Sequence, residues 1–310
     1  MGKIPIDVLN STVLSMTGAA SREVITPPRA GLDFAAVRVE KKFMIVSSDP
    51  VTGVKRDIGR YAVNVNANDV ATSGNWPQYL ESVVLLPPSS KEGDLREIAR
   101  QIHETALSLG MSILGGHTEV TPGLRSPIVV ATAFSFVDEY VSSMGAKPGC
   151  TLMMTKTAGL EGTAILTGSK TMLSRISVVG EAVAAYQTGR VLAMHDCTEG
   201  GVLGAAYEMA LASGIGFELD AAAVPVSAET RRLCARRSID PLKLIGSGSL
   251  LLCVKEGGED EVKEALEGIC EVTPVGRFTG RSKTVILSSG ERVRVEAAPE
   301  DELWRLLGDL

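Results

Sequence analysis

Residues 57–80 have the sequence DIGRYAVNVNANDVATSGNWPQYL, in which asparagines and an aspartate interrupt an apolar pattern. It predicts a helix over residues 58–71, because Asp57 is suited to cap the first turn and a Ser-Gly pair follows the last. Asn64 and Asn68 lie four positions apart and so share one face, with Asp69 beside them near the C-terminal end. A carboxylate is unfavourable at that end of a helix unless a cation binds there. The alternative is a polar face exposed to solvent.

Apolar patterning on both sides of this helix predicts alternating strands and helices. The first half is expected to contain a hairpin over residues 35–47, a strand over 81–86, a helix over 91–109, a strand over 112–114 that two glycines break, and a strand over 127–137. The second half is expected to contain strands near 151–155, 216–219 and 250–254, helices from about 162, 178 and 201, a helix over 260–269, and a closing hairpin and helix. We therefore predict an α/β fold in two domains, residues 1–140 and 141–310.

Composition narrows the class of protein. The chain has 310 residues, is 45% hydrophobic and carries a formal charge of −6 without a long basic run, which disfavours a nucleic-acid or acidic-membrane surface. Its five cysteines are odd in number and form no C-x-x-C pair, which argues against a disulfide framework and a structural zinc site. With no apolar stretch long enough to cross a bilayer, we expect a cytoplasmic protein.

Four aspartates each occupy a short polar break between apolar runs: Asp33 in GLDFAAV, Asp49 in VSSDPVTG, Asp69 in NANDVATSG and Asp196 in MHDCTEGG. A nucleotide polyphosphate is itself negative, so carboxylates approach it only through hard cations that accept oxygen ligands. The pattern therefore predicts a site for Mg²⁺ and a nucleotide. Backbone N–H donors for the phosphates are expected at residues 17–21 and 198–201, which both contain glycine.

The HDCTEGG motif precedes an alanine-rich segment that is predicted to form a helix. Thr198 is suited to cap this helix, while Gly200 and Gly201 would let a phosphate approach its N-terminus. A capped helix start without any ligand is the alternative interpretation.

The GGHTE motif closes a predicted strand. Gly115 and Gly116 are conformationally permissive and place His117 at the strand tip, where it would meet a ligand. An ordinary surface or core histidine is the alternative interpretation.

Seven motifs in order resemble one superfamily: GLDFAAV, SSDPVTG, the stretch at 57–80, GGHTEV, PGCTLMMTKTAGLEG, MHDCTEGG and GSGSLLL. It contains aminoimidazole ribonucleotide (AIR) synthase, selenophosphate synthetase, thiamine-monophosphate kinase and the hydrogenase maturation protein HypE. The resemblance implies a two-domain PurM-like architecture, with an N-terminal α/β domain that dimerises through its sheet or a barrel, a C-terminal α/β domain, and ATP with Mg²⁺ near the dimer cleft. The four aspartates match the superfamily's metal positions, and Gly115, Gly116 and His117 match its strand-end motif near the reacting phosphates.

Within the superfamily, the overall pattern is most similar to HypE. HypE proteins finish with a cysteine-bearing tail that accepts a carbamoyl group, whereas no cysteine follows Cys270 here. Selenophosphate synthetases use a cysteine or selenocysteine and a lysine in the N-terminal loop, and residues 12–29 contain neither Cys nor Lys. We therefore expect a divergent relative rather than either of these enzymes.

Our functional hypothesis is an Mg²⁺- and ATP-dependent enzyme that transfers phosphate to an unidentified small-molecule acceptor or hydrolyses ATP. Asp49, Asp69 and Asp196 would be the main metal ligands and Asp33 a further one, with Asp69 also essential for turnover. Asn68 would orient phosphates or metal waters, and His117 would contact the transferred phosphate or the acceptor. Two alternatives are a HypE-like maturation factor with a protein partner, and a non-catalytic nucleotide-binding assembly subunit.

Overall fold

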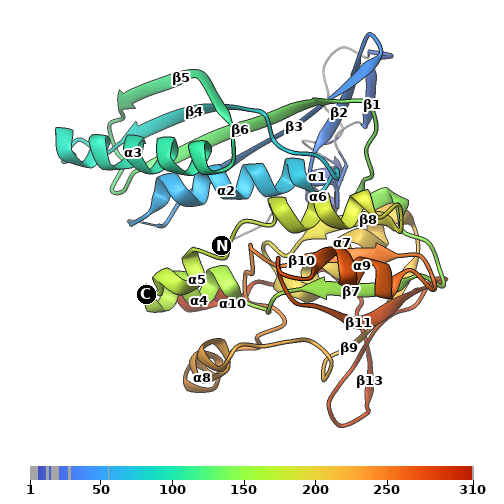
Figure 1. The fold of residues 1–310 in the computed structure, drawn as a ribbon. Coiled ribbons are helices and arrows are strands. Elements are labelled where there is room, and N and C mark those ends of the chain that lie inside the picture. The colour runs from blue at the N-terminus through green and yellow to red at the C-terminus, as the bar shows by residue number, and fades with distance from the viewer. Residues whose placement is uncertain (1–5, 12–13, 15–20, 27–28, 55, 309–310) are drawn as a thin grey trace.

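The computed structural model describes residues 6–11, 14, 21–26, 29–54 and 56–308. These residues form two β-sheets, one from residues 24–137 and one from residues 151–294, with helices packed on both (Figure 1). The predicted mixed α/β class is therefore confirmed. In the part of the chain described, no helix combines the length and the apolar character needed to span a membrane.

The first sheet has the strand order β1-β2-β3-β6-β4-β5. Only the β4–β5 pair is parallel, and the sheet is open, with β1 and β5 at its edges. The strands are β1 (Val24–Thr26), β2 (Ala35–Val39), β3 (Lys42–Val51), β4 (Tyr79–Leu86), β5 (Ser112–Val120) and β6 (Ile128–Val137).

Two helices, α2 (Ile58–Ala71) and α3 (Glu92–Ser108), cover one face of the first sheet (Figure 1). Along β6 every second residue is buried, as expected for a strand with one covered face. The opposite face carries Tyr79, Phe134 and Phe136, which are half-buried and form an aromatic cluster with ring centroids 5.2 Å apart for the first pair. No described helix covers this face in Figure 1.

The second sheet has the strand order β13-β12-β9-β11-β7-β10-β8 and is antiparallel except for the β12–β9 pair. Its strands are β7 (Thr151–Thr155), β8 (Val191–Asp196), β9 (Gly216–Asp220), β10 (Leu250–Val254), β11 (Val272–Thr279), β12 (Lys283–Ile286) and β13 (Arg292–Arg294). The other helices are α1 (Ile6–Ser11), α4 (Leu160–Thr167), α5 (Lys170–Leu173), α6 (Val179–Gln187), α7 (Gly201–Ser213), α8 (Ala228–Arg237), α9 (Glu259–Leu266) and α10 (Glu302–Gly308), with a 3₁₀ turn at Ser143–Gly145.

Helix α2 is buried between the first sheet and α6 (Figure 1). One apolar cluster includes Val63 and Val70 of α2, Val179 of α6 and Leu250 of β10, so both halves of the chain share a core. Asn66 and Asn68 are fully buried, which makes the solvent-exposed polar face that we considered for this helix wrong. A buried amide needs hydrogen-bond partners, and these asparagines have them.

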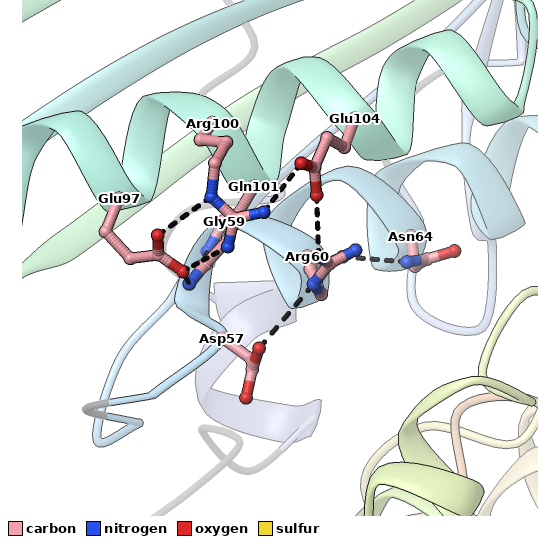
Figure 2. Close-up of polar contacts among 8 residues, drawn as sticks. All are labelled: Asp57, Gly59, Arg60, Asn64, Glu97, Arg100, Gln101 and Glu104. Atoms are coloured by element: carbon pink, nitrogen blue, oxygen red, sulfur yellow. Dashed lines mark hydrogen bonds and ion pairs between the residues drawn. The ribbon is translucent and has the colours of Figure 1, made fainter.

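Polar contacts also fix α2 against α3 (Figure 2). The Arg60 guanidinium lies 2.8 Å from the Glu104 carboxylate, and the N–H of Gly59 donates to Gln101 Oε1 at 3.1 Å. A Cβ on Gly59 would lie only 2.7 Å from the Ile98 carbonyl oxygen, so the two helix backbones approach closely because this residue lacks a side chain. The helix that carries Asn68 and Asp69 is therefore held from both sides.

Three local predictions are wrong. Asp57 adopts a left-handed conformation (φ 57°) and does not cap α2 with its side chain, which instead lies 3.5 Å from Arg60. Thr198 does not cap α7, whose N-cap residue is Gly200. Gly115 and Gly116 do not break the strand, because β5 runs through them to Val120 beside β4, with a register shift at Leu80 and Glu81.

Candidate functional site

The four predicted aspartates come from four separate elements. Asp33 precedes β2, Asp49 lies near the end of β3, Asp69 is in the last turn of α2, and Asp196 ends β8. Burial raises the pKa of Asp69 well above its usual value, and the carboxylates of Asp196, Asp49 and Asp33 raise it further. The fold thus gathers these side chains, which we call the aspartate cluster, around Asp69.

Neighbouring polar groups orient two members of the aspartate cluster. The Ser47 hydroxyl donates to Asp69 Oδ2 at 2.6 Å. The backbone N–H of Asp49 donates to Asn66 Oδ1 at 2.7 Å, while the Asn66 amide donates back to the Asp49 carbonyl at 3.3 Å. These bonds join the end of β3 to α2, orient the Asp69 carboxylate and hold the backbone of Asp49 in place.

No role was predicted for His195, a histidine that lies beside Asp33 and Asp196 of the aspartate cluster. His195 is buried, with Nε2 at 3.0 Å from Asp33 Oδ1 and 3.3 Å from Glu208 Oε2. Its Nδ1 lies 2.8 Å from the backbone oxygen of Asp196. Burial alone would lower the pKa of His195, but Asp33 and Glu208 outweigh it and raise the pKa well above its usual value. When protonated, His195 offsets part of the negative charge of Asp33 and Glu208.

Two members of the aspartate cluster, Asp33 and Asp196, have together with His195 the spacing of a metal site. One ligand atom each from Asp33, His195 and Asp196 lie within 4.8 Å of one another. Carboxylate oxygens are the ligands that Mg²⁺ prefers, and Asp69 is buried among like charges that a cation would compensate. Asp33 also pairs with His195. Metal binding by Asp49, Asp69 and Asp196 stays a prediction.

Asn68 makes a different contact from the one we expected. Its side-chain amide donates to the Ile176 carbonyl at 2.8 Å, and its Oδ1 accepts from the Val178 N–H at 2.8 Å. Both ends of the amide therefore bind the loop before α6. This geometry gives Asn68 a role in joining the two halves of the chain and does not support the phosphate contact that we predicted.

The start of α7 is already engaged by protein groups. The Gly200 N–H donates to Asp301 Oδ2 at 2.7 Å, and the Gly201 N–H donates to the Thr198 carbonyl at 3.0 Å. A Cβ on Gly201 would lie 2.7 Å from the carbonyl oxygens of Leu242 and Leu244, so this glycine permits close packing. Phosphate binding at Thr198, Gly200 and Gly201 stays a prediction and would require Asp301 to leave. Of the other predicted phosphate donors, residues 17–20 lie outside the described part of the chain.

His117 lies away from the aspartate cluster within one chain. It is on edge strand β5, with 65% of its side chain exposed and Nε2 at 3.4 Å from Glu119. Two strands, β6 and β4, separate β5 from the Asp49 strand β3, which at the usual spacing corresponds to about 14 Å. Its predicted contact with a phosphate, and that of Gly115 and Gly116, would need a ligand or a second chain to span this distance.

Comparison with known proteins gives matches along both halves of the chain. Residues 31–137 match the family described as AIR synthase related protein, N-terminal domain, and residues 147–288 match its C-terminal domain. The chain is 29% identical over 285 residues to carbamoyl dehydratase HypE of Escherichia coli, covering 86% of this chain and 82% of that protein.

Two solved structures share the fold. A chain of a HypE–HypF complex superposes with a TM-score of 0.79 at 22% identity, covering 93% of this chain and 99% of that one. HypE in complex with ATP superposes with a TM-score of 0.75 at 20% identity, covering 96% and 93% of the two chains. The predicted superfamily and its PurM-like α/β fold are thus confirmed, although neither sheet of the described residues closes into a barrel.

Proposed function

Because the chain belongs to the AIR synthase-related family, we propose that it is a HypE-like enzyme that binds Mg²⁺ and ATP at the aspartate cluster and acts on the terminal phosphate. The observation that carries this proposal is the position of Asp69, buried beside three further carboxylates drawn from both halves of the chain. Burying a carboxylate beside like charges is energetically unfavourable unless a cation is bound, so this arrangement is typical of a metal site.

In this proposal, the residues of the chain provide position and charge. Asp49, Asp69 and Asp196 hold Mg²⁺, which when bound neutralises phosphate charge during transfer. Ser47 and Asn66 fix the positions of Asp69 and Asp49, and His195 holds Asp33 in place. The acceptor is a small molecule or a group carried by a partner protein, and the HypE–HypF complex favours the second for a HypE-like chain.

We also propose that two copies of the chain associate through the uncovered face of the first sheet. Tyr79, Phe134 and Phe136 provide apolar area there, and β5 lies at the adjacent edge. Association of this kind would give His117, Gly115 and Gly116 access to a nucleotide held by the other copy. The division into domains at residue 140 is part of the same proposal, since it separates the residues of the two sheets.

A non-catalytic nucleotide-binding subunit is the second candidate. The contact between Asp301 and the Gly200 N–H favours it, because this carboxylate occupies a helix N-terminus where a phosphate would otherwise bind. Turnover distinguishes the two candidates. An enzyme releases phosphate together with ADP or AMP, whereas a binding subunit is stabilised by ATP and releases no product.

The direct test of the proposal is calorimetric titration of the protein with ATP, ADP and AMP, each with and without Mg²⁺. We expect heat of binding with ATP that depends on Mg²⁺, and a rise in melting temperature under the same conditions. Failure of every adenine nucleotide to bind at millimolar concentration would refute the proposed function.

A further inference from the structure

Lys156 is a buried cation immediately after β7. Only 8% of its side chain is exposed, and its backbone is left-handed, with φ 53°. Lysine is seldom buried unless its ammonium is paired, and a left-handed backbone is uncommon for a residue with a side chain. Both features indicate that this position is constrained by the contacts that the side chain makes.

The ammonium of Lys156 binds three oxygen atoms. It lies 2.8 Å from Glu181 Oε1, and it donates to the carbonyls of Ser177 at 2.6 Å and Arg175 at 3.2 Å. Glu181 is held in turn by the Thr155 hydroxyl at 3.0 Å. The cation thus ties the start of α6 and the loop before it to the end of β7.

Successive backbone groups of the loop at residues 175–178 bind two different side chains, those of Lys156 and Asn68. The carbonyls of Arg175 and Ser177 accept from Lys156, whereas the carbonyl of Ile176 and the N–H of Val178 bind the Asn68 amide, each at 2.8 Å. One side of the loop therefore faces the second sheet and the other faces α2. A Cβ on Gly248 would lie 2.6 Å from the Ile176 Cα, so the loop has little room to shift.

We propose that Lys156 is a positioning residue for the nucleotide site, acting through the loop at 175–178 and Asn68 to hold Asp69 in the aspartate cluster. This inference rests on the proposed function, because it assigns Lys156 a part in that same site. Asn68 and Asp69 are adjacent, so a rotation of the last turn of α2 would displace the carboxylate. An apolar side chain at position 156 would pack there but would leave two carbonyls and Glu181 without this donor.

A cavity beside Lys156 allows the proposal to be tested by chemical rescue of a variant with a small amine. It has a volume of about 690 Å³ and is lined by Lys156, Arg175, Ser177, Glu181 and Cys270 among others. A small amine can therefore reach the position of the ammonium from solvent. In Lys156→Ala, n-propylammonium would replace the part of the side chain that alanine lacks, whereas n-propanol would supply the same length without the charge.

The experiment measures the Mg²⁺ concentration that gives half of the ATP-induced rise in melting temperature. We expect Lys156→Ala to raise this Mg²⁺ concentration about tenfold or more, as for other residues that orient metal ligands. We expect n-propylammonium, and not n-propanol, to restore it. Asn68→Ala should have a similar effect, and the double variant should be little worse than either single one. Lys255→Ala is the matched control, because its ammonium also binds a carbonyl, that of Gly189, but on an exposed part of the chain.

Several outcomes would overturn the proposal. These are an unchanged Mg²⁺ requirement in Lys156→Ala, additive effects of the Lys156 and Asn68 substitutions, and equal rescue by n-propanol. If Lys156→Ala does not fold, Lys156→Ala/Glu181→Gln replaces it, since the second change removes the unpaired carboxylate. If the melting temperature of the wild-type protein does not respond to Mg²⁺ and ATP, the proposed function fails. Hydrogen exchange at the last turn of α2 still tests whether Lys156 holds that turn through the loop at 175–178 and Asn68. Exchange there should be faster in Lys156→Ala than in Lys255→Ala, and equal rates would refute the role of Lys156.

Discussion

Glu161 gives a prediction whose magnitude follows from the structure. This residue lies in the first turn of α4, is buried, and has one carboxylate oxygen, Oε2, without a hydrogen-bond partner. Burial raises its pKa to about 7 from an ordinary value of 4.5, and Asp301 and Glu199 add to the rise. The hydroxyl and the backbone of Ser247 lower the pKa in part.

The sign of the effect follows from proton linkage. The folded chain binds the Glu161 proton more tightly than the unfolded chain, so the wild type loses stability as the pH rises from about 4.5 to about 7. Each pH unit of pKa difference corresponds to about 1.4 kcal/mol, so the loss from this group is about 3 kcal/mol. Glu161→Gln keeps the size of the side chain and has no proton to lose, so this part of the pH dependence should vanish.

The assay is urea unfolding of the wild type and Glu161→Gln at several pH values between 4.5 and 8, at one protein concentration. We expect the free energy of unfolding of the variant to rise relative to that of the wild type up to about pH 7 and then to level off, with a total gain of about 3 kcal/mol at pH 8 relative to pH 4.5. Glu264→Gln, on an exposed face of α9, is the control and should follow the wild type. Parallel curves for the wild type and Glu161→Gln would refute the reasoning.

Two further predictions concern the first sheet. Gly116→Ala should lower the melting temperature markedly, because φ is 145° and the new Cβ would lie 1.8 Å from the Ser82 carbonyl oxygen. Gly115→Ala is the control and should change the melting temperature little, because its Cβ meets nothing within 4 Å. Equal melting temperatures of the two variants would contradict the close approach of β5 to β4. Phe134→Asp should convert a dimer to a monomer in light scattering, because it puts a charge on the uncovered face, while Leu107→Asp, 69% exposed on the opposite side, should not. A wild-type protein that is already monomeric would end the dimer proposal.

Much of the fold could be predicted from local pattern. Helix α2 runs over Ile58–Ala71, the predicted range, because its apolar spacing and the Ser-Gly pair that follows it are both local signals. Strand β11 was missed because Pro274 and Gly276 interrupt its pattern, and the structure has a register shift between them. Helix α8 was missed because arginines dominate it and only Thr230 and Cys234 are buried.

The candidate site could be predicted only in part. Each aspartate lies in a polar break between apolar runs, which is a local signal, and the family resemblance linked the four. His195 could not be found in this way, because its contacts with Asp33 and Glu208 form only in the folded chain. The partners of Asn68 are likewise 108 and 110 residues away in sequence, so its contact with the second half had no local signal.

The central claim is that Asp69 is buried among carboxylates in order to hold a cation that binds ATP, and Asp69→Asn tests it most directly. In the absence of ligand, we expect the variant to melt at or above the wild-type temperature, because it replaces a carboxyl group whose charged form is disfavoured by burial and by three neighbouring carboxylates, and it keeps the shape of the side chain. With Mg²⁺ and ATP, the wild type should be stabilised, by about 2.7 kcal/mol at a ligand concentration of one hundred times Kd, and Asp69→Asn should not respond. A variant that responds to Mg²⁺ and ATP as the wild type does would contradict the account.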